Sequence, residues 1–153
     1  MISEQAINAA VAWLDESDDH YEQTLQKLQA ENPVLLSYLF SETFSAFTRR
    51  EREFALYLAL VLYQAVKSER EQVPPVTEEQ LSQAEERNWD LLQDGAKSRH
   101  FHERLDVFFE DSPQEELLAF LEDALSDDSD GWVTLEGREA LYASLKSIVD
   151  CIT

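Results

Sequence analysis

The stretch Phe54-Ala-Leu-Tyr-Leu-Ala-Leu-Val-Leu-Tyr-Gln-Ala-Val66 decides the fold, because it is apolar on every side of a helix and interrupted only by Gln64. A helix of this kind must be surrounded by other helices. At 13 residues the run is too short for the roughly 20 that cross a bilayer, so it predicts a buried core helix and no membrane span. The helix is expected over about 49–70, with Thr48 and Glu51 forming a capping box at its start.

Working outward from this helix, apolar residues recur three and four positions apart, and sustained strand-like alternation is absent. The sequence therefore predicts an all-α fold, a single multihelical bundle of seven or eight helices around the buried helix. Further capping patterns begin at Thr77 and at Ser112-Pro113, and Pro33 suits the first turn of a helix. Helices are expected over 3–16, 19–31, 33–46, 49–70, 78–94, 99–110, 113–126 and 135–151.

The 153 residues suit one domain, 1–153, since neither half alone has much core. Val73-Pro74-Pro75-Val76 is expected to be an extended connection between an N-terminal and a C-terminal helical half, because proline disfavours helix at and before its own position. The single cysteine, Cys151, suits a reduced intracellular protein, and the N-terminus lacks the pattern of a secretory signal. We expect a cytoplasmic protein in which Cys151 acts as a small buried hydrophobe.

The formal net charge is −20, from 32 acidic and 12 basic side chains. Such a surface repels nucleic acid and anionic lipid, so neither is expected as a partner. With only three glycines, the chain has no Gly-rich phosphate loop and no nucleophile elbow. The acid is concentrated in residues 1–32, 71–96 and 113–131, whereas 33–70 carries five basic and four acidic side chains.

These observations predict a non-enzymatic acidic module that binds a basic protein partner, as an inhibitor, immunity-type or adaptor protein does. The candidate partner-binding residues lie in the acidic segments: Glu78, Glu79, Glu85, Glu86, Asp90, Glu122 and Asp127. The alternative is that the charge serves only solubility. In that case the domain is structural and forms a homodimer, through exposed aromatics such as Trp13 and Trp89.

The only basic cluster is Arg49, Arg50 and Arg52, in the first turn of the central helix, where the helix dipole disfavours cations. Two interpretations stay open. The arginines form ion pairs with Glu51, Glu53 and a neighbouring helix. Alternatively, they form an anion site together with the free amides of the helix end.

Residues 126–137 resemble a calcium-binding EF-hand loop. The resemblance places oxygen ligands at Ser126, Asp128 and Asp130. The first ligand is Ser instead of Asp, and Gly137 stands where the pattern has a bidentate Glu. No cofactor is therefore expected, and calcium is the alternative. An acidic turn followed by a helix capped by Thr134 explains the same residues.

His100 and His102 flank Phe101 and are the remaining candidate metal ligands. On a helix these two histidines point in different directions, so one ion would need a His–carboxylate pair. We expect surface or capping histidines, with a transition-metal site as the alternative.

Overall fold

The computed structural model describes residues 1–94, 100–126 and 132–153, and these contain helices and no strand. The eight expected helical segments are all found, two of them divided in two. The helices are α1 (Glu4–Glu16), α2 (Asp18–Glu31), α3 (Pro33–Leu39), α4 (Glu42–Ser45), α5 (Arg49–Glu69), α6 (Glu78–Asp94), α7 (Phe101–Arg104), α8 (Asp106–Asp111), α9 (Glu115–Ser126) and α10 (Arg138–Ile152). The all-α prediction is confirmed.

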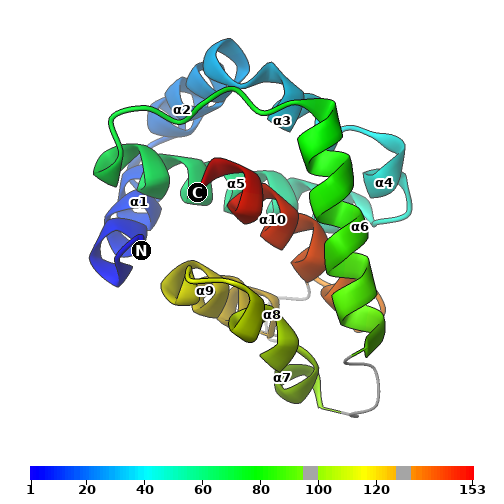
Figure 1. Ribbon diagram of the computed structural model, residues 1–153. Coiled ribbons are helices and arrows are strands. Elements are labelled where there is room, and N and C mark those ends of the chain that lie inside the picture. Colours follow the sequence, from blue (N-terminus) through cyan, green and yellow to red (C-terminus); the bar gives the residue numbers. More distant parts are fainter. Residues whose placement is uncertain (95–99, 127–131) are drawn as a thin grey trace.

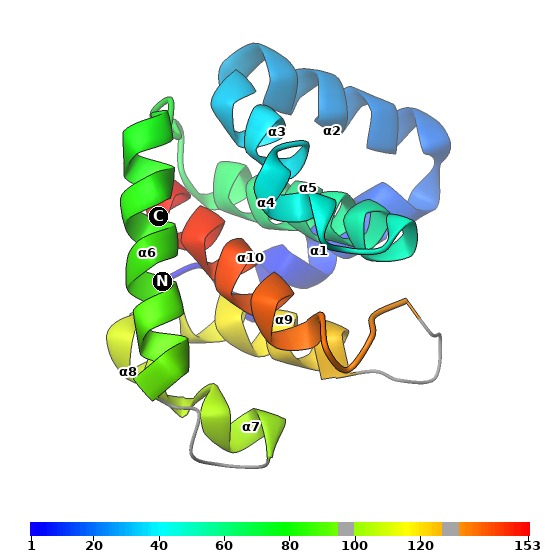
Figure 2. The same cartoon turned by 90° about the vertical axis from the view of Figure 1, so that its right-hand side faces the viewer.

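The helices are stacked in layers, as Figures 1 and 2 show. Helices α2 and α3 cover one side of the α1–α5 pair, and α10 lies between α5 and α9. Helix α6 crosses α10 at a steep angle and packs against it more extensively than any other pair of helices packs together. This crossing leaves one long face of α6 at the edge of the molecule.

The centre of the molecule is shared by two helices. Every residue of α5 from Leu58 to Tyr63 is buried, as the apolar run predicts. Every residue of α10 from Leu141 to Val149 is buried too. This second run includes polar residues, among them Lys146, and apolar periodicity alone therefore understates how deeply α10 lies.

The predicted helix starts are confirmed at α5 and α6. Thr48 and Glu51 exchange both bonds of a capping box, and Thr77 and Gln80 do the same. At α9 the hydroxyl of Ser112 instead accepts from the amide of Gln114, and the helix begins at Glu115, two residues later than expected.

Two expected helices are divided. After α3, the amide and the hydroxyl of Ser41 both donate to the Tyr38 carbonyl, and this local bonding competes with continuation of the helix. Between α7 and α8, the amide of Leu105 is shared between the Phe101 and His102 carbonyls, and the fully buried Leu105 side chain anchors the bend.

Residues 71–77 are non-helical, as the two prolines predict. Asn32 holds this connection in place. Its side-chain amide donates to the Pro74 carbonyl at 3.3 Å, and its Oδ1 accepts from the Val76 amide at 2.6 Å. Buried residues from both sides of the connection belong to one continuous hydrophobic cluster.

Within the described residues, no helix is long and apolar enough to cross a bilayer.

Candidate protein-interaction surface

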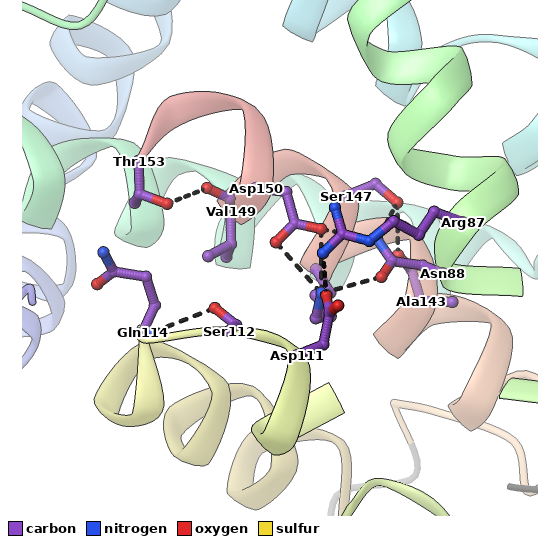
Figure 3. A network of polar contacts seen from close by, with 11 residues as sticks. Arg87, Asn88, Asp111, Ser112, Gln114, Ala143, Ser147, Val149, Asp150 and Thr153 are labelled. Atoms are coloured by element: carbon purple, nitrogen blue, oxygen red, sulfur yellow. Dashed lines mark hydrogen bonds and ion pairs between the residues drawn. The ribbon is translucent and has the colours of Figure 1, made fainter. Parts of the chain in front are cut away.

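The inner face of α6 is fixed by a buried polar cluster around Lys146 (Figure 3). The Lys146 ammonium is fully buried and donates to Asn88 Oδ1 at 3.0 Å, Asp111 Oδ2 at 2.8 Å and Asp150 Oδ2 at 3.0 Å. An ammonium has three protons, so this donor is satisfied. The ammonium also lies 5.6 Å from the ring centre of Phe108.

Asn88 connects α6 to this cluster. Its side chain is fully buried, and its amide nitrogen donates to Ser147 Oγ and Asp150 Oδ2, both at 3.0 Å. With Lys146 on its oxygen, Asn88 fixes the rotation of α6 about its own axis. The opposite face of α6 is therefore presented in one defined orientation.

Charge balances within the cluster. Burial alone would raise the pKa of Asp111, but the hydrogen bonds and positive charges of Lys146 and Arg87 hold it below its usual value. Arg87 reaches Asp111 from the edge of α6. Every charged group of the cluster therefore has a partner of opposite charge, and the cluster holds α6 in place without a free acid or base.

The outward face of α6 carries Glu79, Gln83, Glu86 and Asp90, all exposed and spaced one turn apart. We call these four residues the acidic face of α6. Gln83 donates to Glu79 at 3.3 Å, and no cation of the described residues forms an ion pair with the three acids. A shallow depression of about 310 Å³ on this face is lined by Gln83, Glu86 and Asp90 together with Arg87 and Leu91.

The other candidate acids lie elsewhere. Glu78 is exposed, and it lines a small cavity between α6 and α3 together with the half-buried Glu85. Glu122 contacts Nδ1 of His102 and lies on α9, away from α6. Asp127 lies outside the described residues. On one face, the structure therefore brings together only part of the predicted partner-binding set, namely Glu79, Glu86 and Asp90.

The three arginines of the predicted cluster diverge. Arg49 pairs with Glu53 at 3.0 Å, as expected. Arg50 lies over the ring of Trp132, with its guanidinium carbon 5.6 Å from the ring centre. Arg52 is exposed and lines, with Arg49, a mostly apolar groove of about 300 Å³ between α4 and α5.

Glu51 does not pair with these arginines. It is buried, and its Oε2 accepts from the amide of Thr134 at 3.0 Å and from its hydroxyl at 2.8 Å, while Oε1 accepts from the Thr48 amide. Burial raises the pKa of Glu51, but these hydrogen bonds outweigh it and the net shift is downward. Glu51 thus attaches the turn before α10 to the start of α5.

The loop that resembles an EF-hand is described only at its ends. Asp128 and Asp130 lie outside the described residues. Ser126 ends α9, and its buried hydroxyl has no hydrogen-bond partner among the described residues. At Gly137 an added Cβ would lie 2.1 Å from Glu51 Oε2, so this position has no room for the bidentate Glu of the pattern.

The remaining metal candidates do not converge either. His102 is paired with Glu122, and His100 stands at the start of α7. In the described part of the chain, no three His, Cys, Asp or Glu side chains are grouped as metal ligands.

Cys151 is half-buried and packs against the hydrophobic core. Burial, with a smaller contribution from Asp150, raises the pKa of its thiol to about 11. The thiol is therefore neutral at physiological pH and a poor nucleophile.

The aromatic residues that we expected at a homodimer surface are partly covered. Trp13 and Trp89 are both half-buried, and Trp13 stacks on His20 with ring centres 3.5 Å apart. The exposed large hydrophobic side chains are others: Met1, Phe40, Trp132 and Leu135.

Sequence reasoning missed the Lys146 cluster. A signal was present, because Lys146 lies one turn from Tyr142 and from Val149 on the apolar side of its helix, with Asp150 four positions on. A lysine at such a position needs buried acceptors, which indicates carboxylates from neighbouring helices.

No protein-family model matches this chain, and comparisons with curated proteins and with solved structures find no match either.

Proposed function

We propose that this protein is a non-enzymatic, cytoplasmic interaction module that binds a basic protein partner through the acidic face of α6. One observation carries the proposal: Glu79, Glu86 and Asp90 are exposed along one helix face without a cationic partner among the described residues. A partner with lysine or arginine side chains at helical spacing supplies the missing charge.

The position of these acids along α6 adds to the argument. Glu79 is in the first turn, where the helix dipole favours a carboxylate. Asp90 is near the other end of α6, where the dipole disfavours it, and the last turn contains no basic residue. A cation from a partner would therefore stabilise Asp90 more than it would stabilise Glu79.

The anchoring of α6 favours binding as well. Because Asn88 and Lys146 hold the helix from inside, the backbone of the acidic face loses little conformational entropy when a partner docks. A fixed, charged surface of this kind suits an inhibitor, an immunity-type protein or an adaptor.

The test is charge reversal at the C-terminal half of the face. We expect Glu86→Lys with Asp90→Lys to weaken binding of a lysine-rich helical 20-residue peptide by roughly tenfold or more at low salt, measured by calorimetry. Binding to the unchanged protein should weaken as salt rises, because the interaction is electrostatic.

The matched control reverses two exposed acids elsewhere, Glu22→Lys with Glu71→Lys, and has the same net charge. It should change the affinity less than about twofold if the site is local. If the two double variants weaken peptide binding equally, the proposal is contradicted. The interpretation that the charge serves only solubility is then favoured.

A further inference from the structure

The N-terminal end of α5 carries a groove that the proposed binding of a basic partner to α6 does not use. Its floor is apolar, formed by Leu39, Phe44 and Leu56, and its volume is about 300 Å³. Phe40 stands at its rim with 74% of its surface exposed. A cavity of this size and composition holds one or two aliphatic side chains.

A second apolar feature is held at the same end of the molecule. Leu135 is 70% exposed and Trp132 is 40% exposed. Their segment is attached to the start of α5 by the Glu51–Thr134 bonds and by the contact of Arg50 with Trp132. Figure 2 shows α4, the start of α5 and the segment leading into α10 on one face.

The groove side of this end belongs to the least acidic segment of the chain. Residues 33–70 have five basic and four acidic side chains, against a net charge of −20 for the whole chain. A second copy is repelled by most of the surface, and the repulsion is weakest here. The two features also carry opposite charges. Exposed Glu136 follows Leu135, and exposed Arg52 lines the groove without an ion pair among the described residues.

We propose that two copies of this chain associate through this end, with Leu135 of each copy in the groove of the other and Glu136 against Arg52. An interface made of equivalent patches closes into a twofold dimer. Exposed large hydrophobic residues lie on both halves of the contact, as an interface core requires. The apolar area is small for a stable dimer, so a dissociation constant of roughly 10–100 µM is expected.

The test is sedimentation equilibrium of the full chain from about 1 to 500 µM protein, at low salt and in 500 mM NaCl. Added salt should strengthen this association, because it screens the repulsion between two highly acidic copies. Binding of a basic partner to α6 should weaken under the same change. Because the two expected salt dependences are opposite, a result that contradicts the dimer leaves the proposed binding of a basic partner untouched, and the reverse also holds.

Variants locate the contact. Leu135→Ser and Phe40→Ser should each raise the dissociation constant about tenfold or more. Arg52→Glu and Glu136→Arg should each weaken the dimer, and the two together should restore it. All four positions are exposed, so folding is retained, which circular dichroism checks.

The control is Lys27→Glu, which makes the same charge change as Arg52→Glu at an exposed position on α2. Its effect should be smaller than that of Arg52→Glu. A protein that stays monomeric at 500 µM in high salt overturns the proposal. So does a dimer that Leu135→Ser and Phe40→Ser leave unchanged, or one that the double charge exchange does not restore.

Discussion

At the residue scale, Lys146 is the side chain on which most of the polar interior depends. Its ammonium is the shared donor for carboxylates on α8 and α10 and for an amide on α6. Removing one member of a buried ionic cluster costs more than the cluster contributes, because the remaining charges stay buried without partners.

We therefore expect Lys146→Met to lower the free energy of unfolding by about 3–5 kcal/mol, measured by urea denaturation. The control is Lys67→Met, which removes the partly exposed ion pair with Glu31 and should cost about 1 kcal/mol. Equal losses in the two variants would show that the Lys146 cluster has no special weight.

Asp111 makes the same cluster sensitive to acid. Its pKa in the folded protein lies below the ordinary value, so the ionised carboxylate stabilises the fold above that ordinary value. This contribution is lost as the pH falls through the lowered folded pKa. Asp111→Asn should therefore be less stable than the unchanged protein at pH 7, and the difference should shrink toward pH 3, measured by urea unfolding at both pH values.

At the element scale, the start of α5 and the turn before α10 form one unit through Glu51. Gly137 belongs to it because a side chain at this position would displace the Glu51 carboxylate. Its backbone φ of −82° is open to any residue, so the reason for glycine here is the space that the Glu51 carboxylate occupies.

Gly137→Ala should thus lower the free energy of unfolding by about 1–3 kcal/mol, because it strains the contact or breaks the Glu51 hydrogen bonds. Glu136→Ala, next to it and exposed, should change stability by less than about 0.5 kcal/mol. Thermal and urea unfolding measure both. An alanine at 137 without effect would mean that Glu51 contributes little to holding the turn.

The helices followed from the sequence wherever local chemistry determines them. Thr48 with Glu51 and Thr77 with Gln80 mark helix starts that the structure confirms. The division at Ser41 was not predicted, because apolar periodicity continues across it while the side chain bonds to its own backbone.

The candidate site likewise has a part that the sequence predicts and a part that it does not. The acids on α6 could be found because they are a property of one helix. The bonds that join Lys146 on α10 to Asn88 on α6 and to Asp111 on α8 link residues 58 and 35 positions apart, and only packing shows that they meet. Likewise, adjacent arginines formed a cluster in the sequence but point to different neighbours in the fold.

At the scale of the whole molecule, charge opposes compactness. With a net charge of −20 on 153 residues, the acidic side chains repel one another. Ion pairs such as Arg104–Glu139 offset only part of this repulsion. We expect the thermal midpoint to rise by several degrees between 20 and 500 mM NaCl, measured by circular dichroism. A midpoint that falls with salt would show that ion pairs outweigh the overall repulsion.

The Asn32 clamp on the proline-rich connection bears on how the molecule opens. Val76 has an amide outside any helix, yet this amide is bonded to a buried side chain. Amides of irregular segments usually exchange with solvent quickly. Slow exchange at the Val76 amide would mean that its bond to Asn32 opens only when the α1–α5 part separates from the α6–α10 part. If the two parts unfold as one cooperative unit, this proton should exchange as slowly as the slowest amides of α5 and α10.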